Sequence, residues 1–301
     1  MARMSFREDV SLNVLPEGCI ANVLSFTSPR DACRLSVVSS LFKSAEESNA
    51  VWERFLPHDY QSIISKSDSS STLLASLSSK KDLYLRLCEK PIIIDHGKKS
   101  FSLEKKSGKK CYMLSARDLM IVWGDTPTYW RWNSDPCSRF GEVAELISVC
   151  WFEIRGKISA TMLSPATLYT AYLVFKPTQG AYGLDYQPVE VGVGLVGSES
   201  GKRNVYLDSD RGRAQQYQFV RRRTGLFNRR RMVGMQAPAR ENSGQHPKER
   251  GDGWLEVELG EFFCKEGEDE ELEMSAQEVK GGDWKGGLIV EGIEIRPKEG
   301  K

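Results

Sequence analysis

The sequence predicts an α+β chain in two parts: a small N-terminal three-helix unit, then a larger antiparallel β-sandwich of jelly-roll type. Apolar residues recur at helical spacing near the start of the chain. From Ile92 onward, valine, isoleucine, tyrosine and tryptophan alternate with polar residues between glycine-containing turns. Many short strands without intervening helices indicate an antiparallel sandwich. At 301 residues the chain has the length of one large or two modest domains.

Composition and charge exclude several classes of protein. The 42 Lys+Arg residues balance 41 Asp+Glu residues, so the chain is not basic throughout as a histone is. The longest apolar stretches, such as Pro91–Ile94, have the length of a strand, and we expect no membrane span. The N-terminus has no apolar signal core, so we expect no secretion through a signal peptide. Seven scattered cysteines without a CxxC pair favour a reducing compartment over a zinc ribbon or a disulfide scaffold.

Motifs for catalysis, cofactors or metals are lacking. The three histidines, His58, His96 and His246, do not stand in an HExxH pattern, and we expect no metal site. No Walker loop and no GxSxG motif is present. Residues 192–197 fit GxGxxG loosely, but they lie in a β-branched run with no helix after it. We therefore expect no catalytic residues and no cofactor.

Residues 15–57 predict three short helices, preceded by a tail over residues 1–14. Apolar residues recur at positions 20, 23 and 24 after a Leu-Pro-Glu start. Ser28 is predicted to cap a second helix that begins at Pro29, with Asp31 as the capping-box acid and an apolar stripe that continues to Phe42. A third helix is predicted from Ser48 or Asn49 to the residue before Pro57.

Residues 58–110 predict a serine-rich linker, one helix and the leading strands of the β part. Nine serines lie between residues 61 and 79 and indicate a flexible connection. Ser79 and Asp82 then mark a helix start, with Leu83, Tyr84 and Leu87 on one face.

The β-sandwich is predicted over residues 111–298, with a basic insert at about 198–250. The candidate strands share an alternation of β-branched or aromatic with polar residues: Leu119–Trp123, Tyr129–Trp132, Glu145–Arg155, Leu168–Lys176, Pro188–Val196, Trp254–Leu259, Glu271–Ser275 and Leu288–Arg296.

The first module resembles an F-box. The resemblance rests on a Leu-Pro start, a Ser-Pro-x-Asp helix junction, a small apolar second helix and a late tryptophan: Leu15, Pro16, Ser28–Asp31, Cys33–Ser39 and Trp52. A three-helix unit with excess apolar side chains also needs a partner to cover it. The resemblance implies that the partner is the adaptor subunit of a cullin-based ubiquitin ligase. The contact residues we predict are Leu15, Pro16, Ile20, Leu24 and Val38, with packing onto the β part as the alternative.

The second module resembles the phloem-protein-two, or Nictaba-like, lectins. The stretches that carry the resemblance span residues 111 to 298: Ser115–Asp125, Tyr129–Trp132, Val143–Leu146, Cys150–Lys157, Tyr172–Lys176, Asp252–Glu256 and Gly292–Pro297. The resemblance implies a β-sandwich that binds glycans containing N-acetylglucosamine. Joined to an F-box, it is similar to a plant subfamily of F-box lectins, in which the ubiquitin-transfer chemistry belongs to other subunits.

The sugar site implied by this family maps onto Trp123, Trp130, Glu271 and Glu278. An exposed indole offers a flat surface to the C–H face of a sugar, and carboxylates accept hydrogen bonds from its hydroxyls. The alternative for each tryptophan is the sandwich core, and Trp151, Trp254 and Trp284 are expected in the core or at its rim. The acidic run over residues 266–273 is expected to be mostly a solvated loop.

Eight arginines between Arg211 and Arg231 leave three interpretations open: a solvated loop, a nuclear-import signal, or nucleic-acid contact with Tyr217, Phe219 and Phe227 interleaved. We favour the solvated loop and expect no nucleic-acid partner. We expect the chain in the cytoplasm and the nucleus.

Two other functions compete with glycan recognition. One is a β-sandwich that binds protein targets without sugar recognition. The other is a glycosidase, which would need two carboxylates about 5–5.5 Å or about 6.5–9.5 Å apart, with Glu271 and Glu278 as the candidates.

Overall fold

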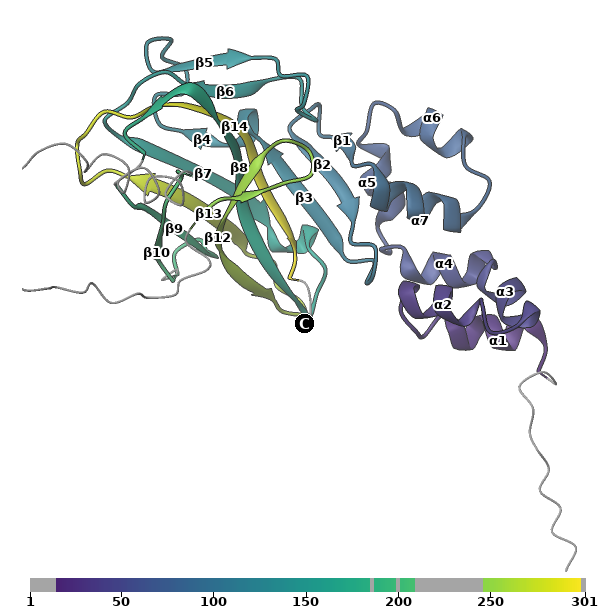
Figure 1. Ribbon diagram of the computed structural model, residues 1–301. Helices are drawn as coiled ribbons and strands as arrows, with labels where there is room; N and C mark the ends of the chain where they lie inside the picture. The colour runs from purple at the N-terminus through teal and green to yellow at the C-terminus, as the bar shows by residue number, and fades with distance from the viewer. Residues whose placement is uncertain (1–14, 185–186, 199–200, 209–245, 299–301) are drawn as a thin grey trace, which may run out of the picture. The chain divides into compact units, whose positions relative to one another are not determined.

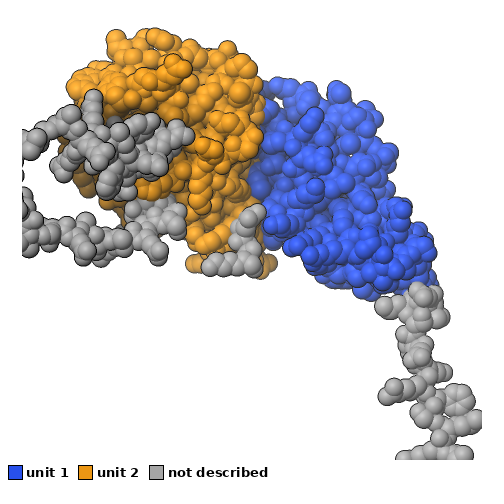
Figure 2. Space-filling model, in the orientation of Figure 1, with its two compact units in different colours: residues 1–96, 100–111 blue, residues 97–99, 112–301 orange. Residues whose placement is uncertain are grey.

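The computed structural model describes residues 15–184, 187–198, 201–208 and 246–298. It confirms an α+β chain in which helices come first and antiparallel strands follow (Figure 1). The chain divides into two compact units, residues 1–96 with 100–111 and residues 97–99 with 112–301 (Figure 2). The tail over residues 1–14 and most of the predicted basic insert, including all eight arginines, lie outside the described residues.

Four helices, not three, begin the first unit: α1 (Glu17–Leu24), α2 (Pro29–Leu35), α3 (Ser40–Glu46) and α4 (Asn49–Phe55). The start of α2 follows the prediction, because the Ser28 hydroxyl accepts a hydrogen bond from the backbone N–H of Asp31 at 3.1 Å. The predicted second helix is broken after Leu35, and the Ser39 hydroxyl accepts from the N–H of Phe42 to start α3. A serine that hydrogen-bonds to the backbone competes with a continuous helix, which explains the break.

The serine-rich stretch forms helices, so the predicted flexible connection is wrong for residues 60–75. Helices α5 (Tyr60–Ser65) and α6 (Ser70–Ala75) bury Ile63, Ile64 and Leu73. The serine-rich composition drew attention away from the few apolar residues of this stretch. Their burial is sufficient to dock two short helices.

The last helix of the first unit is α7 (Lys80–Glu89), followed by strands β1 (Ile92–Ile94) and β2 (Lys99–Leu103). Its start is as predicted, since the Ser79 hydroxyl accepts from the N–H of Asp82 at 3.1 Å.

Trp52 lies at the centre of the first unit. Its side chain is buried, and its indole N–H donates to the carbonyl oxygen of Glu46 at 2.7 Å. Its ring lies 5.5 Å from that of Phe55 and 5.1 Å from that of Tyr84 on α7. The four N-terminal helices therefore share one core with α7.

The second unit is built from two antiparallel sheets. One has the order β3-β14-β8-β12-β11, with β6 paired to β14 and β5 paired to β6; the other has the order β10-β9-β13-β7-β4. The bounds are β3 (Lys110–Ser115), β4 (Met120–Ile121), β5 (Trp130–Asn133), β6 (Val143–Leu146), β7 (Phe152–Ser159), β8 (Thr167–Tyr182), β9 (Val189–Leu195), β10 (Arg203–Val205), β11 (Lys248–Glu249), β12 (Leu255–Cys264), β13 (Glu271–Glu278) and β14 (Gly286–Pro297).

The inner faces of the two sheets pack against each other at glycine positions. A Cβ added at Gly156 on β7 would lie 3.0 Å from Leu114 on β3 and 3.2 Å from Ile293 on β14. On the other side of the sandwich, a Cβ at Gly260 on β12 would lie 3.0 Å from Val193 on β9. The sheets approach closely here because glycine leaves room for the facing side chain.

One predicted strand is divided. The expected strand Glu145–Arg155 splits into β6 in one sheet and β7 in the other, joined by residues 147–151. The connection contains the buried apolar residue Val149, which forms an isolated antiparallel bridge to Lys285. The connection therefore resembled strand in the sequence.

A network of ion pairs covers the outer face of the larger sheet. Arg250 pairs with Glu256 at 3.0 Å and with Glu294 at 2.7 Å, and Arg296 joins the same two carboxylates at 2.6 Å. Burial would raise the pKa of Glu294, but the charges and hydrogen bonds of Arg250, with Arg139 and Arg296, hold that pKa at about 2. Glu294 is therefore ionised at neutral pH.

This network predicts a loss of stability in acid. The pKa of Glu294 is lower in the folded chain than the roughly 4.3 of an unfolded glutamate, so its stabilisation is present above about pH 4.3 and is lost as the pH falls towards 2. Between pH 6 and pH 2.5, the chain should lose on the order of 2–3 kcal/mol more unfolding free energy than its Glu294→Gln variant. Urea titrations at both pH values measure this difference. Equal losses in the two chains would contradict the assignment.

Candidate functional site

The first unit exposes apolar side chains around α1 and α2. Among the predicted adaptor contacts, Leu15 and Pro16 are exposed before α1, and Val38 is 67% exposed after α2. Three residues that the sequence analysis did not assign share this property: Val23, Phe26 and Val37. Val23 could have been identified from the sequence, because it belongs to the apolar repeat of α1. It lies three residues after Ile20 and three residues before Phe26.

Ile20 and Leu24 need correction as contact residues. Both are buried, at 2% and 0% exposure, because the apolar side of α1 packs on α3 and α4 inside the unit. In this conformation they support the surface from beneath and do not offer side chains to a partner. The sequence pattern showed that these positions are apolar, but not which apolar positions of α1 face inward.

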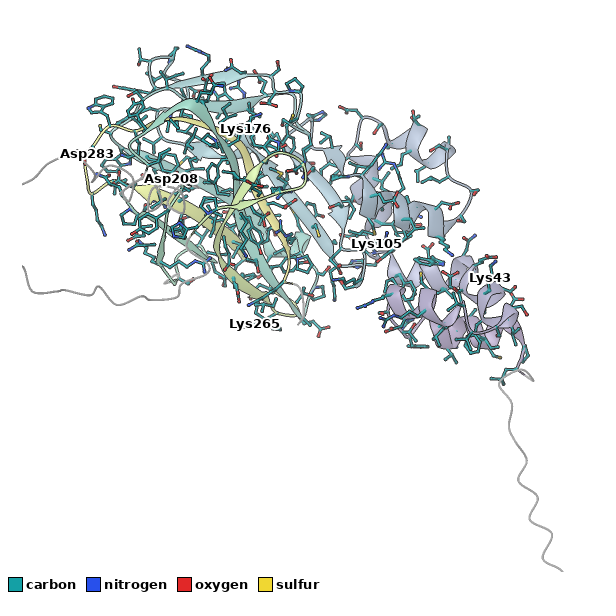
Figure 3. All side chains as sticks on the ribbon, viewed as in Figure 1. Lys43, Lys105, Lys176, Asp208, Lys265 and Asp283 are labelled. Atoms are coloured by element: carbon teal, nitrogen blue, oxygen red, sulfur yellow. The ribbon has the colours of Figure 1, made fainter. Side chains whose placement is uncertain are left out.

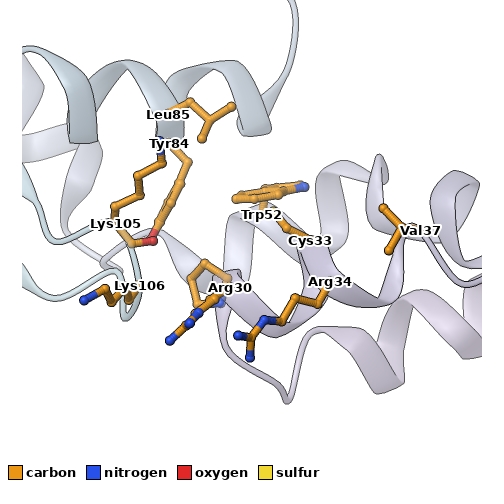
Figure 4. A pocket seen from close by; sticks show the side chains of 10 residues that line it. Arg30, Cys33, Arg34, Val37, Trp52, Tyr84, Leu85, Lys105 and Lys106 are labelled. Atoms are coloured by element: carbon orange, nitrogen blue, oxygen red, sulfur yellow. The ribbon is translucent and has the colours of Figure 1, made fainter. Parts of the chain in front are cut away.

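A pocket of about 460 Å³ opens between α2, α4 and α7 in the first unit (Figure 4). Trp52, Tyr84, Leu85 and Val37 form its apolar walls. Its other lining residues include four cations and no acid: Arg30, Arg34, Lys105 and Lys106. The pocket thus continues the exposed apolar surface of this unit and surrounds it with positive charge.

In the second unit, four connections meet at one end of the sandwich, which we call the aromatic end: residues 122–129, 147–151, 183–188 and 279–285. The register supports this grouping, because the start of β7 pairs with the end of β13, and the start of β14 pairs with the ends of β6 and β8. Asp283 lies at this end, whereas Lys265 in the β12–β13 connection lies elsewhere on the unit (Figure 3).

Trp123 stands on a strained turn at the aromatic end. Its side chain is 41% exposed, and its φ of 58° is in the left-handed region that tryptophan rarely adopts. The turn is closed by hydrogen bonds from the N–H of Gly124 to Ile121 at 3.0 Å and from the N–H of Thr126 to Trp123 at 2.9 Å. One face of the indole meets the ring of Tyr129 at 5.0 Å. Strained residues of this kind cluster at functional sites, which makes Trp123 a candidate binding residue.

Trp130 is corrected to a core residue. It is only 2% exposed, and its ring lies 6.4 Å from that of buried Phe152. Its indole N–H donates to the carbonyl oxygen of Val122 at 3.2 Å, and that of Trp132 donates to Gly124 at 3.0 Å. The two indoles therefore hold the backbone on either side of Trp123 and fix its turn.

Glu278 is also buried, and it belongs to an ion pair. Its carboxylate lies 2.5 Å from the ammonium of Lys285, and the exposures of the two side chains are 5% and 1%. Glu278 also accepts from the N–H of Gly281 at 2.8 Å. Lys285 donates to the carbonyl oxygens of Cys150 at 3.2 Å and of Asp283 at 2.8 Å. The pair joins two connections of the aromatic end from inside, so Glu278 offers no carboxylate to a sugar in this conformation.

Glu271 does not lie near the other predicted sugar contacts. It begins β13, and Glu278 ends the same strand. Seven residues of extended strand separate the two by about 23 Å, and the odd spacing turns their side chains to opposite faces. Glu271 is exposed on the outer face, 3.6 Å from Lys157. The two carboxylates are much too far apart for the glycosidase alternative.

Two tryptophans expected in the core or at its rim are exposed. Trp151 is 44% exposed just before β7, and Trp284 is 53% exposed just before β14. Trp254 is buried as expected. Trp151 directly precedes β7 and Trp284 lies two residues before β14, but buried Trp254 also directly precedes a strand, β12. Position next to a strand therefore does not separate the exposed tryptophans from the buried one.

Other kinds of site find no support in the described part of the chain. No group of three or more His, Cys, Asp or Glu side chains there could hold a metal ion. No helix there is long and apolar enough to cross a membrane. The aromatic residues and arginines considered for nucleic-acid contact lie outside the described residues.

Comparisons with known proteins match both halves of the chain. The family model of phloem protein 2 matches residues 109–297, and that of the F-box domain matches residues 12–54. An F-box protein of Arabidopsis thaliana is 50% identical over 285 residues, which cover 95% of this chain and 80% of the relative. The F-box protein PP2-B1 of Arabidopsis thaliana is 46% identical over 310 residues, covering 95% and 90%. A mannanase structure from Podospora anserina has a TM-score of 0.32 at 9% identity over 64% of this chain and 28% of that chain, too low to carry an argument.

Proposed function

The chain belongs to the phloem protein 2 family and carries an F-box domain, and on this basis we propose that it is a substrate-recognition subunit of a cullin-based ubiquitin ligase. Its first unit binds the adaptor subunit of the ligase. Its second unit selects targets by binding glycans that contain N-acetylglucosamine. The chain itself performs no catalysis, and the ubiquitin-transfer chemistry belongs to other subunits.

The adaptor half of the proposal is supported by the uncovered apolar surface of the F-box. Side chains such as Phe26, Val37 and Val38 are more than half exposed, although burial would stabilise each by about 1.5–3 kcal/mol. Several exposed apolar side chains within one small unit are typical of a protein interface. The basic rim of the neighbouring pocket favours a partner segment that combines apolar and acidic side chains.

Adaptor binding should fall at least 10-fold when Leu15, Pro16 and Val38 are all replaced by alanine, because the exposed contacts are removed while the core is kept. Surface plasmon resonance with purified adaptor subunit measures the affinity. Leu74→Ala is the matched control, since Leu74 is an exposed apolar residue of α6 outside the F-box. An unchanged affinity of the triple variant would remove the adaptor contact from these residues.

Glycan recognition is supported by one observation above all: the exposed indole of Trp123 on a strained backbone. Its free ring face can stack on a sugar, and the indole of Trp130 and that of Trp132 fix its position. Because the side chain of Trp123 is already held in place, less conformational entropy is lost when a ligand binds to it.

Replacing Trp123 by glycine separates binding from folding. Glycine adopts a φ of 58° without strain, so Trp123→Gly should keep the melting temperature while glycan affinity falls at least 10-fold. A glycan array followed by calorimetry with chitotriose measures the loss. Retained binding would remove Trp123 from the site. An array on which the unchanged chain binds nothing, combined with normal adaptor binding, would favour the alternative in which the sandwich binds protein targets.

We also propose that the chain is active in the cytoplasm and the nucleus. The seven cysteines, all free thiols in the structure, suit a reducing compartment. Fluorescence microscopy of a tagged chain, with and without the two arginine triplets at residues 221–223 and 229–231, tests the nuclear part.

A further inference from the structure

A second candidate binding surface runs along the outer face of β7, next to the turn that carries Trp123. Alternate residues of β7 point outward, in the order Glu153, Arg155 and Lys157, and Trp151 continues the same row beyond the start of the strand. Over Glu153, Arg155 and Lys157 the surface is hollowed into a groove of about 550 Å³ that Met120 on β4 also lines, and Trp151 lies beside this lining in the same row. We call it the β7 groove.

The polar groups of the β7 groove are fixed by one another. Arg155 donates to Glu153 at 2.7 Å and to Glu273 of the neighbouring strand β13 at 2.9 Å. The indole N–H of Trp151 donates to the other oxygen of Glu153 at 2.8 Å. Burial would raise the pKa of Glu153, but the hydrogen bonds from Trp151 and Arg155 lower it, so this carboxylate stays ionised. The tryptophan ring and the charged row are therefore held as one unit.

The charges of the β7 groove balance. Its lining residues are three cations and three anions beside Met120, namely Lys99, Arg155, Lys157, Asp118, Glu153 and Glu273. A strongly charged ligand would meet like charges at every position of the groove. A neutral ligand with many hydroxyls finds donors on the cations and acceptors on the carboxylates. The exposed Trp151 and Met120 add apolar surface for its C–H groups.

The groove and Trp123 are neighbours. The N–H of Val122 still donates to the carbonyl oxygen of Glu153 at 3.1 Å, so Trp123 follows directly after the last hydrogen bond between its segment and β7. Six residues of extended strand, from Trp151 to Lys157, span about 20 Å. That length accommodates more than one sugar ring.

We propose that the β7 groove binds a neutral oligosaccharide, with Trp151 as a stacking platform and Glu153, Arg155 and Glu273 as hydrogen-bonding groups. This inference rests on the proposed glycan recognition and adds a second surface to the Trp123 turn. None of these four residues belongs to the sugar site that the family resemblance implies.

The test is calorimetric titration of the full chain with β-1,4-linked tetrasaccharides of N-acetylglucosamine, glucose, xylose and mannose. For at least one of them, Trp151→Ala and Arg155→Met should each weaken binding at least 10-fold, and the affinity should change less than twofold between 50 and 300 mM salt. Phe263→Ala is the matched control, because Phe263 is a half-exposed aromatic residue of β12 in the other sheet. The affinity of the Trp151→Phe variant should lie between that of Trp151→Ala and that of the unchanged chain, since phenylalanine keeps a flat ring and loses the hydrogen bond to Glu153.

The outcomes separate this inference from the proposed function. If a tetrasaccharide binds, and Trp123→Gly abolishes binding while Trp151→Ala and Arg155→Met leave it unchanged at equal melting temperature, the β7 groove is overturned and glycan recognition survives. A steep decrease of affinity with salt would overturn the neutral ligand class. If none of the four sugars binds to the unchanged chain, glycan recognition and the groove are overturned together, while the adaptor proposal is unaffected.

Discussion

Replacement of Trp130 by alanine should destabilise the second unit by about 3–5 kcal/mol, because the buried indole fills space beside Phe152 that the surrounding sheets cannot close. In a unit of this size, the melting temperature should fall by about 6–20 °C. Differential scanning calorimetry of the full chain measures the shift. The resemblance to lectins instead implied a surface role for Trp130, for which the melting temperature would not change.

Two matched variants sharpen this experiment. Trp151→Ala removes an equally large ring from the surface of the same unit and should change the unfolding free energy by less than about 1 kcal/mol. Trp130→Phe keeps most of the buried volume but deletes the hydrogen bond to Val122. It should cost less stability than Trp130→Ala and still weaken chitotriose binding, since the turn of Trp123 loses one support. Equal melting temperatures for Trp130→Ala and the unchanged chain would falsify the core assignment.

The second large effect is expected at the buried pair of Glu278 and Lys285. Glu278→Ala leaves the ammonium of Lys285 inside the unit without its carboxylate, which should cost about 3–5 kcal/mol. Urea unfolding of the single variants Glu278→Ala and Lys285→Met and of the double variant Glu278→Gln/Lys285→Met measures the coupling. The double variant should recover most of the stability, because no unpaired charge remains and glutamine can still accept from Gly281.

Glycan binding by the same double variant distinguishes two roles for Glu278. If Glu278 only holds the connections of the aromatic end in place, chitotriose affinity should recover together with stability. If its carboxylate contacts the sugar, the double variant should fold and still fail to bind. In the structure the carboxylate faces Lys285 and Gly281, and we expect recovery.

The four residues of the predicted sugar site lie in different environments for geometric reasons. Trp123 and Trp130 look alike in the sequence, yet only Trp123 lies in a turn that leaves the sheet, whereas Trp130 is in the first position of a strand whose inner face is covered. Glu271 and Glu278 are close in the chain, but a continuous strand carries them to opposite ends and opposite faces. The glycosidase alternative required these two carboxylates to approach each other, which the predicted strand end at Ser275 would have allowed. The structure places the end of this strand three residues later.

In the first unit, too, local sequence patterns predicted some features correctly, whereas features that depend on tertiary packing were missed. The caps at Ser28 and Ser79 were predictable, because an N-cap is a local hydrogen bond between a side chain and the backbone three residues later. The helices within the serine-rich stretch were not predictable from composition, since Ile63, Ile64 and Leu73 dock in the core of the unit despite the polar residues around them.

From the sequence alone, the succession of a helical part by a β part, the helix caps at Ser28 and Ser79, and the resemblance to an F-box and to phloem-protein-two lectins could be determined, because spacing and local hydrogen bonding are properties of neighbouring residues. The tertiary structure alone decided which tryptophans face solvent, that Glu278 is paired with Lys285, and that Trp151 lies in line with Glu153 and Arg155, two residues that line a groove. Burial and ion pairing depend on segments that are distant in the chain and meet only when the two sheets close on each other.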